Sequence, residues 1–214
     1  MERRQTAIDR WLTVADNSLR TIFGQPTGTG RPSPSDKVTE EPPLSAPARA
    51  HAAGLMRVNH AGEIAAQALY QGQALTARSD EVRQRMAGAA DEENDHLRWC
   101  EQRLQELGSH TSRLAPLWYG GSFSIGVLAG MAGDRWSLGF VAETEKQVVD
   151  HLSGHLQQLP PEDRKSRAIV EQMRIDEAEH GTRAMAAGGA VLPRPIRKLM
   201  AATAKIMTTT AYYI

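Results

Sequence analysis

The sequence predicts an all-α fold, a four-helix bundle with a long apolar crossover and additional helices near both ends of the chain. Four long stretches, the first less regular than the others, place apolar residues at intervals of three and four, as helices that bury one face do. Each stretch also holds a glutamate within its apolar row, and none shows the alternation typical of a strand. The 214 residues suffice for one domain with a sizeable core.

The glutamates in these rows belong to a pattern that occurs twice. A lone glutamate precedes a Glu-x-x-His motif by 30 residues in the first half of the chain and by 32 residues in the second half. The Glu-x-x-His spacing corresponds to about 4.5 Å of helical rise, so both side chains leave one face of the helix. That face is the buried one, where a carboxylate has to be paired or bound to metal. The six residues are Glu63, Glu93, His96, Glu145, Glu177 and His180.

Four carboxylates and two imidazoles that face one bundle core form the ligand set of the ferritin-like dinuclear carboxylate proteins. Carboxylate oxygens can bridge a pair of iron or manganese ions, and each imidazole supplies a neutral nitrogen. The pattern therefore predicts a two-metal site without deciding between iron and manganese. Residues that orient the ligands through hydrogen bonds are expected nearby, although ordinary packing is an alternative for each candidate. These candidates are His60, His151, His155 and Asp176.

Residues 1–46 are predicted to form an amphipathic segment followed by a linker. Charged residues interrupt positions 1–23 and no apolar run follows, so we expect no secretory signal there. The apolar residues favour a short helix that docks on the bundle or lies on a membrane: Ile8, Trp11, Leu12, Ala15, Leu19, Ile22 and Phe23. Residues 24–47 hold six prolines, at positions 26, 32, 34, 42, 43 and 47, and predict a mobile linker.

Residues 47–214 are predicted to form the metal-binding domain. Proline is favoured in a first turn, serine before it and glycine after the last turn, and these signals set the boundaries. We expect bundle helices at about residues 47–77, 80–108, 135–159 and 162–188. The single cysteine, Cys100, excludes an intrachain disulfide, is compatible with a reducing compartment, and falls in the apolar row of the second helix as a small core residue.

The crossover between the second and third bundle helices is unusually apolar. Residues 114–133 contain no charge and have the ~20-residue length of a membrane span. Five glycines and Pro116 interrupt the stretch, and a span would separate the two halves of the ligand set. We expect instead that it touches lipid or lines an entrance for an apolar substrate, with simple packing on the bundle as the alternative. Residues 193–214 predict a basic amphipathic helix, which suits either an anionic membrane or an ordinary protein surface.

Four runs of residues resemble the demethoxyubiquinone hydroxylases of ubiquinone biosynthesis. The runs are Arg57–Ile64 (Arg-Val-Asn-His-Ala-Gly-Glu-Ile), Glu93–Leu97, Glu145 with His151 six residues on, and Asp176–His180. The Asn-His-Ala-Gly-Glu sequence is the most specific, and the resemblance covers residues 47–214. Some members of that family have tyrosine after the counterpart of His151, whereas this chain has Leu152, so a redox role for such a tyrosine does not carry over.

The resemblance implies a membrane-associated di-iron monooxygenase that installs a ring hydroxyl on a polyprenyl quinone with dioxygen. The six residues of the repeated pattern would bind two iron ions per chain, with Glu93 and Glu177 as the bridges. The crossover and the C-terminal helix would form one membrane-facing surface, which would bind the cytoplasmic face of the inner membrane if the protein is bacterial. No GxGxxG fingerprint is present, so the external electron donor is either a nicotinamide or a separate reductase. Association with other enzymes of the pathway stays open.

Two other classes of protein remain as alternatives. A ferritin-like iron-storage or peroxide-scavenging protein would use nearly the same ligands, but it has no need of an uncharged crossover. A non-enzymatic helical membrane adaptor would explain the apolar segments, but not six metal-ligand residues in order. The formal net charge of zero gives no indication of a nucleic-acid partner.

Overall fold

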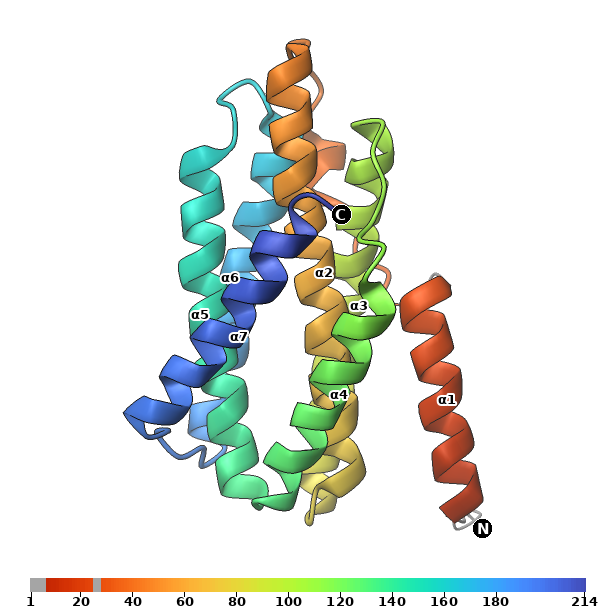
Figure 1. Ribbon diagram of the computed structural model, residues 1–214, viewed down its shortest axis with the longest axis vertical. Coiled ribbons are helices and arrows are strands. Elements are labelled where there is room, and N and C mark those ends of the chain that lie inside the picture. Colours follow the sequence, from red (N-terminus) through yellow and green to blue (C-terminus); the bar gives the residue numbers. More distant parts are fainter. Residues whose placement is uncertain (1–6, 25–27) are drawn as a thin grey trace.

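The computed structural model describes residues 7–24 and 28–214, and within these ranges the protein contains helices and no strand. Pro26 and the side chains of residues 7–11, including Ile8 and Trp11, lie outside that description. The predicted all-α class is therefore confirmed. In chain order the helices are α1 (Ala7–Phe23), the 3₁₀ turn η1 (Pro34–Lys37), α2 (Ala46–Thr76), α3 (Asp80–Glu106), α4 (Ala115–Met131), α5 (Asp134–Gln158), α6 (Arg164–Ala186) and α7 (Arg194–Ala211) (Figure 1).

Helices α2, α3, α5 and α6 form the bundle, and their ends agree with the predicted boundaries to within about two residues. Local chemistry explains these ends. The hydroxyl of Ser79 accepts a hydrogen bond from the Val82 amide at the start of α3, and the Asp163 carboxylate caps α6 through the Ser166 amide. Gly108 follows α3 with a φ of 70°, a left-handed conformation that glycine adopts without strain.

Two apolar clusters fill the bundle on either side of the six predicted metal ligands, which together form a polar layer. One cluster contains Met56, Trp99 and Met173, while the other contains Met86 and Val141. On each bundle helix the predicted metal ligands stand between residues of the first cluster and residues of the second. Both ends of the polar layer are therefore closed by apolar side chains, which keep water away from it.

Helix α4 forms the crossover, and it packs closely on α2 through glycines. A Cβ atom at Gly126 would overlap the carbonyl oxygen of Leu69, and one at Gly72 would overlap the carbonyl oxygen of Phe123. The outer face of α4 nevertheless exposes Leu117, and Leu128 is 66% exposed. Packing on the bundle and an apolar outer surface thus coexist in this segment. Among the described residues, no helix is long and apolar enough to cross a membrane.

Helix α7 crosses the bundle obliquely on the same near side as α4 in Figure 1, and it contacts α2 and α5. Its C-terminal end is anchored by Arg57, whose Nη1 donates to the carbonyl oxygen of Tyr212 at 2.7 Å. Along α7 the side chains of Leu199 and Ile206 remain exposed, at 69% and 65%. This helix therefore leaves an apolar and basic outer face, as the sequence pattern predicts.

Residues 28–45 run along the bundle, although their composition predicts a mobile linker. Arg103, buried at the end of α3, makes an ion pair with Glu41 at 2.9 Å. Arg98 donates to the carbonyl oxygen of Arg31 at 2.8 Å, and the Arg164 side chain reaches the carbonyl oxygen of Glu40. The described part of this segment has no α-helix and only the 3₁₀ turn η1, and charged groups on the bundle hold it in place.

We expect Gly126→Ala to destabilise the protein, because the added methyl group has to displace the α2 backbone. Overpacking of this kind costs about 1–3 kcal/mol. Gly120→Ala on the same helix is the matched control, since a Cβ atom there meets nothing within 4 Å. It should stabilise the protein by about 0.5–1 kcal/mol through helix propensity. Urea unfolding followed by circular dichroism measures both, and equal effects of the two substitutions would contradict close α2–α4 packing.

Candidate metal centre

The six predicted ligands meet in the polar layer at the middle of the bundle. Helix α2 supplies one glutamate and α5 another, while α3 and α6 each supply a Glu-x-x-His pair, and all six side chains are buried. The arrangement follows from helix geometry, because each Glu-x-x-His pair continues the apolar row that faces the core. Four helices thus bring together Glu63, Glu93, His96, Glu145, Glu177 and His180.

Two of the glutamates each face both histidines. Glu93 places Oε2 2.9 Å from Nδ1 of His96 and Oε1 3.1 Å from Nδ1 of His180. Glu177 repeats the arrangement, with Oε1 3.2 Å from His96 Nδ1 and Oε2 3.1 Å from His180 Nδ1. Each of these carboxylates therefore spans the space between the two imidazoles with its two oxygens, which is the position that a bridging ligand requires.

The other two glutamates lie at opposite ends of the layer. Glu63 places Oε2 3.7 Å from His96 Nδ1. Glu145 accepts a hydrogen bond from the Tyr70 hydroxyl, and its Cβ would lie 3.4 Å from a Cβ at Gly181, so the glycine leaves room for the α5 side chain. Within the described residues, the ligand atoms that lie within 4.8 Å of one another belong to Glu63, Glu93, His96 and Glu177.

The layer has the chemistry of a site for divalent cations. Glu63 Oε2 is buried and makes no hydrogen bond with the part of the chain that the structure describes. A buried carboxylate oxygen without a partner is costly, and a cation satisfies it. Carboxylate oxygens with imidazole nitrogens form a donor set that suits iron, manganese and related ions. The donor set of the layer therefore fits divalent cations.

Burial and mutual repulsion raise the pKa values of the two outer carboxyls when no cation is bound. Burial raises the pKa of Glu63 well above its ordinary value, and the charges of Glu93 and Glu177 raise it further, against the effect of His96. The pKa of Glu145 is also raised well above its ordinary value, first by burial and then by the charges of Glu177 and Glu93, against the effects of His180 and Tyr70. Burial and repulsion therefore favour the neutral form of both carboxyls in the metal-free protein.

Neighbouring carboxylates favour the protonated form of both histidines, against the effect of burial. Burial acts to lower the pKa of His96, but the charge of Glu93 and hydrogen bonds with neighbouring carboxylates raise it well above its ordinary value. For His180 the bonds with Glu177 and Glu93 outweigh burial and raise the pKa to about 12. Burial would raise the pKa of Glu93, yet the charge of His96 and a bond from His180 lower it overall. The His96 and His180 rings and the Glu93 carboxylate therefore favour each other's charged forms in the metal-free protein.

Each histidine also contacts a carboxylate through Nε2, the ring nitrogen opposite the one that faces the layer. Nε2 of His96 lies 2.9 Å from Oδ2 of Asp176, which the sequence singled out as a candidate. Nε2 of His180 lies 2.8 Å from Oε2 of Glu92, a residue that sequence reasoning missed. The signal was available, because Asp176 and Glu92 each immediately precede the glutamate of a Glu-x-x-His motif. Such carboxylates fix the ring so that Nδ1 faces the layer.

The three other candidate histidines lie apart from this arrangement. His60 is buried, its Nδ1 has no hydrogen-bond partner among residues 7–24 and 28–214, and burial lowers its pKa to about 4. His151 and His155 pack against each other on α5, with ring centroids 3.9 Å apart. His155 stands ten residues after Glu145, about 15 Å along the helix. Burial lowers its pKa to about 3. His60 is thus near the layer in sequence, whereas His151 and His155 are displaced along the bundle.

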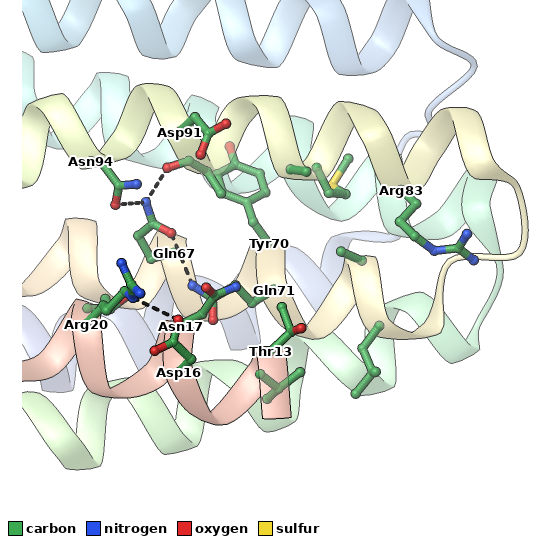
Figure 2. A pocket seen from close by; sticks show the side chains of 17 residues that line it. Thr13, Asp16, Asn17, Arg20, Gln67, Tyr70, Gln71, Arg83, Asp91 and Asn94 are labelled. Carbon is green, nitrogen blue, oxygen red and sulfur yellow. Dashed lines mark hydrogen bonds and ion pairs between the residues drawn. The ribbon is translucent and has the colours of Figure 1, made fainter. Parts of the chain in front are cut away.

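A pocket of about 630 Å³ lies beside the layer, between α1, α2 and α3. Figure 2 shows Tyr70, Gln67 and Asn94 in its wall, and Tyr70 is the side chain that hydrogen-bonds to Glu145. The Gln67 amide donates to Asn94 Oδ1 at 2.7 Å. One layer of side chains therefore separates the pocket from the ligands. Its lining includes charged and amide groups, which suit a polar molecule better than a polyprenyl tail.

Comparison with known proteins adds independent information. The model of the family described as "Ubiquinone biosynthesis protein COQ7" matches residues 50–211, which include all six residues of the layer. A protein of Nitrosococcus oceani named 3-demethoxyubiquinol 3-hydroxylase is 60% identical over 212 residues, which cover 99% of each chain. Proteins of the same name are 58% identical in Polynucleobacter necessarius (97% of this chain, 99% of the relative) and 55% identical in Ectopseudomonas mendocina (100% and 99%).

We expect the binding of divalent metal to release protons, because the pKa values of Glu63, Glu145, His96 and His180 are raised in the metal-free protein and a bound ion requires these groups deprotonated. The affinity should therefore rise with pH between about pH 6 and pH 8, by about tenfold per pH unit for each proton released. Anaerobic calorimetry with Fe²⁺ in buffers of different ionisation enthalpy counts the protons. An affinity that is flat over this range would contradict the protonation pattern.

Proposed function

The chain belongs to the family described as ubiquinone biosynthesis protein COQ7, and we propose that it hydroxylates the ring of a polyprenyl demethoxyubiquinol at a di-iron centre. Glu63, Glu93, His96, Glu145, Glu177 and His180 would hold the two ions. The observation that carries this proposal is the buried layer in which Glu93 and Glu177 each face both histidines.

The relatives support the reaction class. Proteins named 3-demethoxyubiquinol 3-hydroxylase are 55–60% identical to this chain over almost its whole length. The two alternative classes of protein explain fewer of these structural features. An iron-storage or peroxide-scavenging protein would not need the exposed apolar surface of α4 and α7, and a membrane adaptor would not need a buried layer of six ligands.

The residues of the layer have separable tasks. When bound, two iron ions would supply the activation of dioxygen, of which one atom enters the ring and the other leaves as water, with two electrons and two protons from an external nicotinamide or reductase. Glu93 and Glu177 span both positions, and Tyr70 orients Glu145 through its hydroxyl group. The apolar clusters at both ends exclude water, which protects a reactive centre from side reactions.

Two helices offer a surface for the membrane in which a polyprenyl substrate dissolves. Helices α4 and α7 lie on the near side of the bundle in Figure 1, and they expose apolar side chains there. Helix α7 also carries four basic and no acidic residues, which favours an anionic lipid surface. We propose that this surface binds the cytoplasmic face of the inner membrane peripherally. The exposed apolar residues are Leu117, Leu128, Met131, Ile196, Leu199 and Ile206.

The reaction is tested with the iron-loaded protein, a demethoxyubiquinol, a chemical reductant and ¹⁸O₂. We expect one ¹⁸O atom in the new ring hydroxyl, detected by mass spectrometry. Glu177→Ala and His180→Ala should lower turnover at least about 100-fold, because each substitution removes a predicted metal ligand and so weakens metal binding. His110→Ala is the control, since His110 is exposed in the loop after α3. Normal turnover in the first two variants, or no labelled product from the wild-type protein, would reject the proposal.

Membrane binding is tested by flotation with anionic liposomes. Leu128→Asp with Met131→Asp, or Leu199→Asp with Ile206→Asp, should release the protein, since a charge placed in apolar lipid costs about 2 to 3 kcal/mol per residue. The matched control is Ile175→Asp with Met185→Asp on α6, which also exposes both apolar side chains but lies on the far side of the bundle in Figure 1. Flotation of all three double variants, with full activity on a long-tailed quinol, would show that α4 and α7 are ordinary packing elements.

A further inference from the structure

The segment before α2 lies outside the part of the chain that matches the family model, yet it reaches the back of the metal layer. Backbone amides of Thr29 and Gly30 donate to the two carboxylate oxygens of Asp95, at 3.2 and 3.3 Å. A Cβ atom at Gly28 would overlap the same carboxylate. Asp95 is fully buried and immediately precedes His96. The segment is therefore pressed against α3 beside a predicted metal ligand.

Arg31 is the residue of this segment that comes nearest to the layer. Its Nη2 lies 2.8 Å from Oδ2 of Asp176, and the same oxygen lies 2.9 Å from Nε2 of His96. The guanidinium group also lies over the ring of Trp99, 5.0 Å from its centre, and Arg98 holds the Arg31 carbonyl oxygen. Backbone and side chain of Arg31 are thus both fixed, and Asp176 connects the arginine to the imidazole.

The other histidine has the same arrangement behind it. Nε2 of His180 meets Glu92, and Glu92 meets Nη1 of Arg183 at 3.2 Å. Each imidazole is therefore followed by a carboxylate and then by a guanidinium group. Arg183 stands three residues after His180 on α6, within the region that matches the family model. The counterpart of Arg183 on the His96 side is Arg31, which comes from another part of the chain.

We propose that Arg31 is a positioning residue of the metal centre, which fixes Asp176 and through it the ring of His96. The N-terminal segment then belongs to the centre and does not merely connect α1 to the bundle. Without Arg31, Asp176 keeps the bond from Gln172 to Oδ1 at 2.9 Å, but its Oδ2 loses the donor that holds it beside His96. Partners of this kind typically contribute 10–100-fold to metal affinity. This inference rests on the proposed function, because it assumes the predicted ligands.

The full-length protein is titrated anaerobically with ⁵⁷Fe²⁺, and Mössbauer spectra report the two sites separately. Arg31→Met should weaken one of the two ions about 10–100-fold and alter the spectrum of that site alone. Arg31→Lys should restore part of the affinity, since it keeps the charge without the planar group. Glu41→Gln is the matched control, because it removes another anchor of the same segment at Arg103, away from the layer. It should bind both ions as the wild-type protein does.

A second measurement separates positioning from mere attachment of the segment. In an Asp176→Asn background, Arg31→Met should cause little further loss of affinity, since both substitutions break the same connection to His96. Equal weakening by Arg31→Met and Glu41→Gln, or unchanged binding and spectra in Arg31→Met, would overturn the inference. If the wild-type protein binds two ions and hydroxylates the quinol while Arg31→Met behaves normally, only the inference fails. If the wild-type protein binds no pair of ions, the proposed function fails with it.

Discussion

Four carboxylates lie in one buried layer of the bundle, and their mutual repulsion governs the arrangement around them. Carboxylates in an apolar interior have to become neutral, find hydrogen-bond donors or bind cations. The protein combines these solutions. Burial and repulsion raise the pKa values of Glu63 and Glu145, which favours their neutral form, while Glu93 and Glu177 each contact both imidazoles. Both arrangements depend on helices long enough to bring side chains from distant parts of the chain to one level.

The same constraint explains what lies behind the layer. A histidine that faces a metal with Nδ1 has to satisfy Nε2 in a buried place, and Asp176 and Glu92 provide this on the two sides. Asp176 is again a buried charge and Glu92 a partly buried one, and each of them meets an arginine. Outward from the layer, each imidazole is therefore followed by a carboxylate and then by a guanidinium group, and the guanidinium groups reach the surface. This continuity connects the N-terminal segment to the chemistry of the bundle core.

Most of the fold and the predicted ligands were accessible from the sequence, because helix periodicity places residues three and four apart on one face. Glu177 and His180 could be assigned to the core for this reason. Arg31 could not, since its contact with Asp176 spans 145 positions and the prolines around it predicted mobility. The sequence did not decide whether the apolar crossover packs on the bundle or contacts lipid. In the structure Gly126 packs closely on α2 while Leu128 is exposed, and composition alone does not distinguish these two environments. The pocket beside Tyr70 depends on how α1 docks, which no local pattern encodes.

The central claim is that Glu93 and Glu177 hold two ions between them, one beside each histidine. Anomalous diffraction at the iron edge, from crystals grown anaerobically with Fe²⁺, tests it most directly. We predict two iron peaks in the polar layer, the first next to His96 and Glu63 and the second next to His180 and Glu145. A single peak in the layer, or iron bound at His151 and His155 with an empty layer, would contradict the account.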